Sequence, residues 1–262
     1  NMSEPPSKKI KTNNKVKKKD EIRHGNYHQY YEFRSQDSRP QHLEKCLPEC
    51  LKKLAAGNAT NEMYMLDIGC NNGKLTNSLR DVTLSVIKDE KRKVFALGVD
   101  IDTELVNEAV ASYKSEYLDF FPADISTIAL GESEDPIQDY MSSKGIQRFD
   151  FVSCFSVLMY IHLNCGDDGL RKVLDYVCSR AKILVLELQS WKKYRDHVHR
   201  MRREVGEEYD HFSSLEWRGN QGVLEQYIGD YVISKEFSVI CTAEEKNEFN
   251  RNVVIYASNE IV

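Results

Sequence analysis

Short apolar runs alternate with amphipathic stretches from Met63 onward. The apolar runs cover 63–68, 94–99, 117–121, 149–155 and 181–188, and helical spacing is found near 73–87, 103–115 and 168–179. Runs of this length are typical of buried strands, and the intervening spacing is typical of helices that cover a sheet. The alternation predicts an α/β fold in which a mostly parallel sheet has helices on both faces.

The later part of the chain is less regular. Residues 131–147 are expected to form a connecting loop or a short helix, and 191–204 a basic helix. After a polar stretch, the apolar segments 232–245 and 250–258 fit an antiparallel hairpin at the sheet edge. Together these elements predict a seven-stranded sheet with a C-terminal antiparallel hairpin.

Composition favours one globular domain. The chain has 262 residues, 41% of them hydrophobic and 29% charged, and no run of eighteen apolar residues that could span a membrane. Seven cysteines occur without a CxxC pair or the histidine spacing of a zinc site, so we expect reduced thiols in an intracellular protein and no bound metal.

The first nineteen residues are more basic than the rest of the chain. Residues 1–19 contain seven lysines and one glutamate, although the whole chain has a net charge of −5. We expect a disordered Lys-rich tail at 1–22 and a folded domain at 23–262, of which 23–40 line the substrate pocket. The tail could be a nuclear-import signal, a loose nucleic-acid contact or a solvated leader.

Glycines four residues apart mark the end of the first predicted strand. In the segment LDIGCNNGKL, Gly69 and Gly73 flank Asn71, so the segment lacks the second glycine of the dinucleotide fingerprint GxGxxG. Asp100 ends the second strand, where a carboxylate can accept the ribose hydroxyls of a nucleoside. Asp124 follows the third strand and could bind an adenine amino group. Aspartates at strand ends are also common helix caps, as expected for Asp102.

The three segments LDIGCNNG, GVDID and ADI together resemble the motifs of class I, Rossmann-like methyltransferases, which bind S-adenosylmethionine. The resemblance implies that Gly69 and Asn71 face the methionine part of this cofactor, Asp100 the ribose and Asp124 the adenine. The segment after the fourth strand, 153–164, lacks the Asp/Asn-Pro-Pro-aromatic motif of many amino-group methyltransferases. Its absence argues against an amino-group acceptor.

Three further motifs carry a closer resemblance. GNYxxYYxFR at 25–34, GCNNGxLT at 69–76 and IHLNxGDxGL at 161–170 resemble the bicoid-interacting-protein-3-type RNA methyltransferases over roughly residues 24–258. That family has a branch that caps small nuclear RNA with a methylphosphate. Its other branch methylates the 5′-monophosphate of precursor microRNA and histidine tRNA. The compact chain, the short connector and the segments 191–195 and 210–212 favour the monophosphate branch.

The family resemblance also assigns residues to the site. It implies a cofactor site that adds Tyr31, Arg39, Ile101, Ile125 and Phe155 to the residues above, and a phosphate-binding end formed by Tyr27, Tyr30, Arg34, Met159, Tyr160 and His162. His162 could instead be a hydrogen-bonded core histidine, and Arg34 a surface ion pair. The family's EPQPW is replaced by Glu187-Leu188-Gln189-Ser190-Trp191, a loop without prolines.

These observations predict methyl transfer from S-adenosylmethionine to the 5′-monophosphate of a small RNA. Such a phosphate has a second pKa of about 6 and is already an anionic nucleophile at neutral pH, so no general base is needed. The alternatives are capping of a 5′ triphosphate, an RNA-end-binding scaffold without turnover, and methylation of a protein or metabolite. We expect a monomer that binds RNA 5′ ends and no membrane, in the cytoplasm, the nucleus or both.

Overall fold

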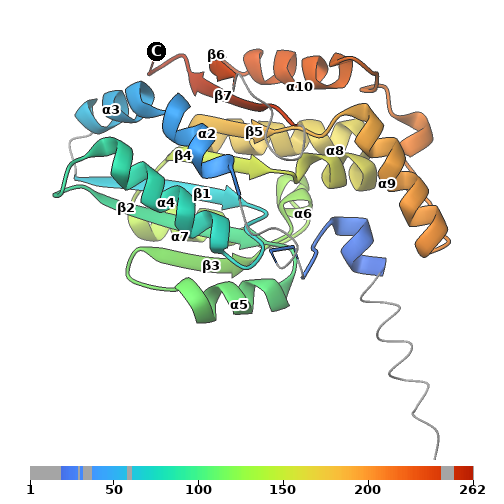
Figure 1. Cartoon of the computed structure of the whole chain (residues 1–262), viewed down its shortest axis with the longest axis horizontal. Coiled ribbons are helices and arrows are strands. Elements are labelled where there is room, and N and C mark those ends of the chain that lie inside the picture. Colours follow the sequence, from blue (N-terminus) through green and yellow to red (C-terminus); the bar gives the residue numbers. More distant parts are fainter. Residues whose placement is uncertain (1–18, 29, 32–36, 58–60, 243–250, 262) are drawn as a thin grey trace, which may run out of the picture.

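The fold is built on one seven-stranded sheet. A computed structural model describes residues 19–28, 30–31, 37–57, 61–242 and 251–261 (Figure 1). Strand order is β3-β2-β1-β4-β5-β7-β6. The strands are β1 Glu62–Ile68, β2 Lys93–Asp100, β3 Leu118–Pro122, β4 Phe149–Phe155, β5 Ala181–Glu187, β6 Phe237–Thr242 and β7 Val253–Ser258.

Strand directions follow the predicted pattern. Strands β1 to β5 pair in parallel, β7 runs antiparallel to β5, and β6 runs antiparallel to β7. The order changes direction between β1 and β4, because the chain builds outward through β2 and β3 before it crosses to β4. Parallel sheets bind ligands where such a change leaves a crevice at the carboxyl ends of the strands.

Helices cover both faces of the sheet (Figure 1). Side chains of β1 alternate between two cores: Met63 and Met65 face one, whereas Leu66 and Ile68 pack with the other, as the period of two in a strand requires. The first core is closed by α2 Arg39–Cys46, α3 Pro48–Gly57, α4 Lys74–Ile87 and α5 Thr103–Tyr113. The second is closed by α6 Ile125–Leu130, α7 Pro136–Lys144, α8 Leu158–Arg180, α9 Trp191–Glu204 and α10 Val223–Ile233. The predicted α/β class is confirmed.

Several element boundaries differ from the sequence prediction. Helix α8 begins at Leu158, ten residues before the predicted start at 168, and it bends at Gly166, where φ is +70°. The connector 131–147 contains the short helix α7, one of the two forms expected for it. Helix α10 occupies the stretch described as polar, and β6 starts at Phe237 instead of 232.

The folded part also begins earlier than predicted. Residues 19–24 are helical, and Ile22 is only 1% exposed. The Ile22 carbonyl lies 2.7 Å from Nε2 of His197. Residues 19–22 therefore belong to the domain and not to the tail. Residues 1–18, which hold most of the Lys-rich segment, lie outside the described residues.

No helix within the described ranges is both long and apolar enough to cross a membrane. All seven cysteines are free thiols, as predicted.

Candidate active site

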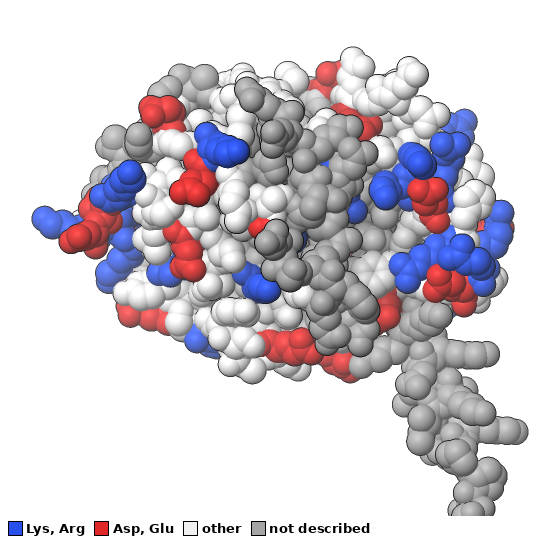
Figure 2. All heavy atoms as spheres, viewed as in Figure 1, with Lys and Arg blue, Asp and Glu red and all other residues white. Residues whose placement is uncertain are grey.

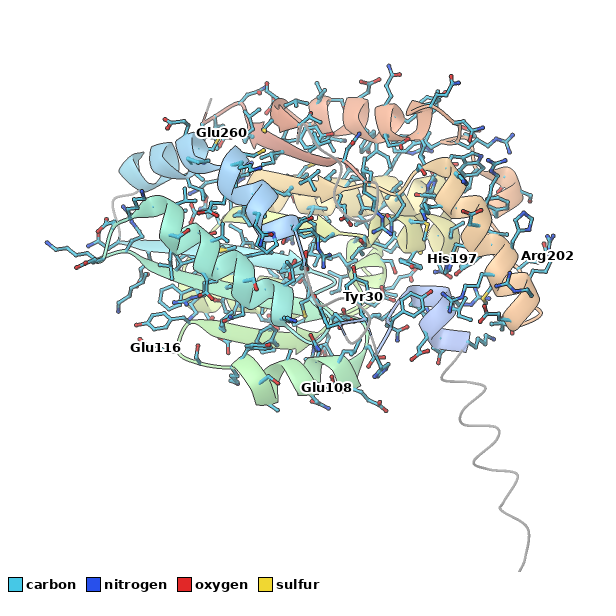
Figure 3. The ribbon with its side chains drawn as sticks, in the orientation of Figure 1. Tyr30, Glu108, Glu116, His197, Arg202 and Glu260 are labelled. Atoms are coloured by element: carbon cyan, nitrogen blue, oxygen red, sulfur yellow. The ribbon has the colours of Figure 1, made fainter. Side chains whose placement is uncertain are left out.

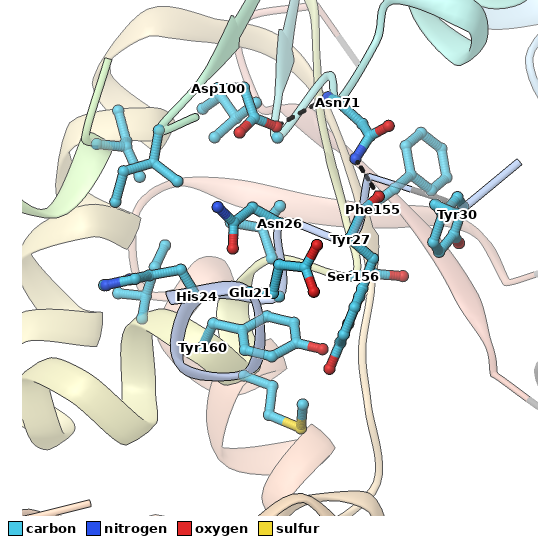
Figure 4. A pocket seen from close by; sticks show the side chains of 18 of the residues that line it. Glu21, His24, Asn26, Tyr27, Tyr30, Asn71, Asp100, Phe155, Ser156 and Tyr160 are labelled. Carbon is cyan, nitrogen blue, oxygen red and sulfur yellow. Dashed lines mark hydrogen bonds between the residues drawn. The ribbon is translucent and has the colours of Figure 1, made fainter. Parts of the chain in front are cut away.

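A cavity of about 670 Å³ opens at the carboxyl ends of the parallel strands (Figure 4). Its walls come from the loops that follow β1, β2, β3 and β4, from residues within 21–28 together with Tyr30 and Tyr31, and from one face of α9. This is the crevice that the strand order predicts. Its size is within the range of pockets for nucleotide-sized ligands.

The turn after β1 forms the floor of the cavity. Gly69 has φ +79°, and a Cβ there would lie 2.2 Å from Cγ2 of Val157. A larger residue at 69 would therefore meet both backbone strain and a clash. The Gly69 and Cys70 amides donate to the Val99 carbonyl at 2.8 and 3.0 Å, which ties the turn to the end of β2. Asn71, with φ +51°, then lies at the cavity wall.

Asp100 is the central acid of the cavity. Its Oδ2 accepts from the Asn71 amide at 2.8 Å and its Oδ1 from the Asp102 amide at 3.0 Å. Its side chain is 7% exposed, and burial raises its pKa to about 6 even though both amide hydrogen bonds favour the ionised form. The backbone thus holds a carboxylate in a fixed orientation at the wall.

The aspartates after β2 and β3 are both helix caps. Asp102 accepts from the Glu104 and Leu105 amides at 2.8 and 3.1 Å, as predicted. Asp124 accepts from the Ser126 amide at 2.9 Å and also lines the cavity. Capping uses only Oδ1 of Asp124, so it does not exclude a ligand contact through Oδ2 of that residue.

Residues 19–28 close one side of the cavity. Asn26 and His28 contact Oδ2 of Asp102 at 2.6 and 3.0 Å, and Asn71 Nδ2 donates to the Tyr27 carbonyl at 3.2 Å. Gly25 has φ +75° and lies directly on the Tyr160 ring. We call residues 19–28 the strap, because they join the β1–β2 side of the cavity to α8 and α9.

The other end of the strap is anchored on α9 and the segment after it. His197 lies on α9 (Figure 3). Its ring and the Tyr209 hydroxyl reach the Ile22 carbonyl, and Arg23 pairs with Glu207 at 2.9 Å. Burial lowers the pKa of His197 to about 4, so its imidazole is neutral and Nε2–H can donate to that carbonyl.

Most of the predicted site residues surround this one cavity. The lining includes Tyr27, Tyr30, Tyr31, Arg39, Gly69, Asn71, Asp100, Ile101, Asp124, Ile125, Phe155, Met159 and Tyr160. Their predicted roles remain proposals. Arg34 lies outside the described residues.

His162 is placed elsewhere. Its side chain is 0% exposed, Nδ1 lies 3.2 Å from the Tyr194 hydroxyl, and Nε2 lies 3.0 Å from Oδ1 of Asp167. Burial lowers its pKa, despite the carboxylate of Asp167. With both ring nitrogens engaged in the core, His162 does not border the cavity, and its expected position beside a phosphate is corrected. The alternative, a hydrogen-bonded core histidine, describes it.

Arg39 and the aromatic residues form a further wall. The Arg39 guanidinium is 3% exposed and makes two hydrogen bonds to Asp37, at 2.8 and 2.6 Å. It lies 5.5 Å from the Phe155 ring centroid and 5.7 Å from that of Tyr30. This wall is rigid and combines one cation with flat apolar faces.

Sequence reasoning missed a polar group at the end of β4. Ser156 has φ +63°, and its hydroxyl contacts Glu187 and Arg251. Arg251 also pairs with Glu187 at 3.0 Å, and Glu187 is 0% exposed. Ser156 and Arg251 line the cavity. The only signal in the sequence was the position of Ser156 at a strand end, because Arg251 comes from the distant start of β7.

Helix α9 contributes residues that the sequence analysis did not assign. Lys193, Asp196, His197 and Arg200 line the cavity and share one helical face. Figure 2 shows lysines and arginines, interspersed with acids, at the end of the molecule where Figure 1 places α9. Their spacing was visible in the sequence, but the direction of that face was not.

Two buried side-chain oxygens at the cavity, Asn26 Oδ1 and Asn71 Oδ1, have no partner among the described residues. Buried polar atoms of this kind usually find a partner, here a ligand or water. With the carboxylate of Asp100 and the close-packed turn at Gly69, they fit a ligand that carries hydroxyl and amino donors. S-adenosylmethionine carries both kinds of donor.

Comparison with known proteins agrees with this geometry. The model of the bicoid-interacting protein 3 (Bin3) family matches residues 149–258. A pre-miRNA 5′-monophosphate methyltransferase of Danio rerio is 31% identical over 205 residues, which cover 75% of this chain and 78% of the relative. A 7SK snRNA methylphosphate capping enzyme of Mus musculus is 24% identical over 228 residues, covering 66% of this chain and 32% of that protein.

A solved structure of WbdD with a kinase inhibitor supports the fold alone, at 15% identity and a TM-score of 0.51, covering 94% of this chain and 47% of that one. Three findings identify the family of the chain. They are the match to the family model, the relative from Danio rerio, and a cavity that contains the predicted strand-end residues. The chain belongs to the bicoid-interacting protein 3 family, closer to its RNA 5′-monophosphate methyltransferases than to its methylphosphate capping enzymes.

Proposed function

We propose that this protein transfers a methyl group from S-adenosylmethionine to the 5′-monophosphate of a small RNA. The observation that carries the proposal is the likeness to an RNA 5′-monophosphate methyltransferase, which extends over 78% of that relative. The cavity supports it, because strand-end acids, a glycine turn and tyrosine hydroxyls meet in one place.

The cofactor half of the cavity is assigned to the strand ends. Asp100 would accept ribose hydroxyls, and Asp124 and the exposed Ile101 would contact the adenine. Gly69 and Asn71 would hold the methionine part, with Tyr31, Arg39, Ile125 and Phe155 completing the wall. When bound, S-adenosylmethionine supplies the methyl group of its sulfonium. The attacking nucleophile displaces the sulfur from that methyl group.

We assign the acceptor half to Tyr27, Tyr30, Met159 and Tyr160. Arg34 would bind a phosphate oxygen. Burial raises the pKa of Tyr27 and of Tyr160, so both hydroxyls keep their protons at neutral pH, and Tyr27 can donate to an anionic oxygen. The phosphate needs no deprotonation by the protein, and the main contribution of these residues is to orient it.

The proposal also covers the substrate pocket, the binding partner, the oligomeric state and the cellular compartment. The strap belongs to the substrate pocket, the RNA 5′ end is the partner, and the protein acts as a monomer in the cytoplasm or nucleus. Size-exclusion chromatography with light scattering tests the oligomeric state, and imaging of the tagged chain tests the compartment.

One RNA prepared with three different ends tests the function directly. Incubation with labelled methyl donor should label the 5′-monophosphate RNA, label the 5′-triphosphate RNA weakly and leave the 5′-hydroxyl RNA unlabelled. Faster labelling of the triphosphate would assign the protein to capping. Binding of 5′-phosphate RNA without any labelling would indicate a scaffold.

A further inference from the structure

The Tyr27 hydroxyl has two hydrogen-bond partners at the cavity. Arg200 Nη1 donates to it at 3.1 Å, and the guanidinium carbon lies 5.2 Å from the centroid of the Tyr27 ring. The Tyr160 hydroxyl is its second hydrogen-bond partner. Figure 4 shows the hydroxyl ends of Tyr27 and Tyr160 next to one another in the cavity. One tyrosine of the strap is thus held from both α8 and α9.

The hydrogen-bonding capacity of a phenol then limits what Tyr27 can do. A tyrosine hydroxyl has one O–H to donate and two lone pairs that accept, whereas a guanidinium can only donate. Arg200 can therefore only donate in this contact, which uses one lone pair of the Tyr27 oxygen. The single O–H of Tyr27 is not used by Arg200 and can donate toward the cavity.

We propose that Arg200 is a positioning residue that makes Tyr27 a donor toward the RNA 5′ end and so favours a terminal phosphate. This inference rests on the proposed function. Phosphate oxygens accept hydrogen bonds and carry charge, so a fixed O–H donor strengthens their binding. A terminal hydroxyl offers an uncharged and weaker acceptor, so it gains less from the same donor.

Burial supports the same conclusion. It raises the pKa of Tyr27 and outweighs the opposite effects of Arg200 and of the Tyr160 hydrogen bond. The proton needed for donation is therefore present at neutral pH. The guanidinium stays charged at any working pH, so its contact with the Tyr27 oxygen does not depend on titration.

Helix α9 provides both the orientation of Arg200 and a matched control. Arg200 Nε donates to Glu204 Oε1 at 3.2 Å, one turn along the helix. Arg203 Nη2 pairs with the same oxygen at 3.0 Å, but its side chain is 71% exposed and it does not line the cavity. Arg203→Ala therefore removes a cation and a Glu204 ion pair of the same kind, without touching Tyr27.

The test compares full-length variants on the 5′-monophosphate RNA. Arg200→Ala and Tyr27→Phe should each lower kcat/KM about tenfold, the loss expected for one charge-assisted hydrogen bond. Because the two groups act through one hydroxyl, the double variant should lose no more than the more severe single variant. Arg200→Lys should recover part of the loss, since an ammonium can still donate. Arg203→Ala should match the unmodified protein.

A binding measurement separates this inference from the proposed function. The affinity ratio for 5′-phosphate over 5′-hydroxyl RNA should fall in Arg200→Ala and in Tyr27→Phe, while cofactor affinity stays constant. Additive losses in the double variant, or an unchanged ratio in both, would overturn the role of Arg200. If the unmodified protein transfers no methyl group, the proposed function fails, and the affinity ratios still decide the role of Arg200. Should Arg200→Ala unfold, Arg200→Lys and Tyr27→Phe carry the comparison.

Discussion

At the level of a single residue, the raised pKa of Asp100 leads us to expect that ligand binding depends on pH. Its pKa is raised to about 6, and only its carboxylate form can accept hydrogen bonds from both ribose hydroxyls. The dissociation constant for S-adenosylmethionine should be nearly constant above pH 7 and rise about tenfold per pH unit below 6, because protonated Asp100 must first lose its proton. Titration calorimetry from pH 5 to 8 measures it.

Asp100→Asn provides the control for that profile. The amide cannot ionise, so its affinity should be weaker at pH 7.5, by about 1.5–3 kcal/mol for the lost charge-assisted bonds, and should not change with pH. A slope in Asp100→Asn equal to that of the unmodified protein would assign the pH dependence to another group.

Met159 bears on whether the protein prefers RNA with a 5′ monophosphate or a 5′ triphosphate. It lines the cavity with 4% exposure and brings no charge to the acceptor side. Met159→Lys would add a cation of similar length, so we expect the rate ratio of triphosphate to monophosphate RNA to rise several-fold. Met159→Leu, which keeps the apolar volume, should leave the ratio unchanged. A ratio that rises equally in both variants would point to cavity shape and not to charge.

Single residues also show which site positions a sequence motif can predict and which it cannot. Gly69 and Asp100 could be placed at the cavity because strand ends follow from the sheet pattern, and Phe155 was assigned through the family resemblance. His162 could not, because successive residues of a helix turn by about 100°, and a motif fixes neighbours in sequence but not the face that each occupies. With α8 starting at Leu158, Met159 and Tyr160 face the cavity and His162 faces the core.

At the level of elements, we expect α9 to contact RNA beyond the first nucleotide. Lys193 lies at the wall, is exposed, and has no ion-pair partner among the described residues, although Asp196 lowers the net charge of this face. Lys193→Ala should raise the KM for RNA and reduce the slope of log KM against log salt by about one. Lys192→Ala, on the neighbouring exposed face, should change neither as much.

That comparison is made by steady-state kinetics at several salt concentrations with saturating cofactor. Equal effects of Lys192→Ala and Lys193→Ala would mean that α9 attracts RNA only through its total charge. An unchanged salt slope in Lys193→Ala would remove this residue from the RNA contact.

The elements that the sequence predicted are those with strong periodicity or long apolar runs. The five parallel strands and α9 belong to this group. Helix α6 has only six residues, too few for a periodic pattern. Helix α10 ends in the apolar pair Val232-Ile233, which the sequence analysis joined to the following strand, although a turn with Glu236 at φ +64° separates them.

For the whole molecule, the mostly parallel sheet with helices on both faces and its C-terminal hairpin could be predicted, and the closure of the cavity could not. Its walls depend on tertiary contacts between distant segments: Tyr27 meets Arg200 across 173 positions, and Arg23 meets Glu207 across 184. Local sequence holds no signal for such pairs. The aromatic residues of 24–34 indicated a pocket, but only the fold shows that the strap lies between β2 and α9.

The strap has a consequence for how the active protein is made. The strap is synthesised before the other described residues. Its anchors His197, Arg200 and Tyr209 are synthesised more than 170 residues later. Contacts of such long sequence separation form late in folding, because a long loop must close before they contribute. Chains that end before α9 therefore lack the anchors of the strap, and we expect the strap to reach its place at the cavity only after the segment up to Tyr209 has been synthesised.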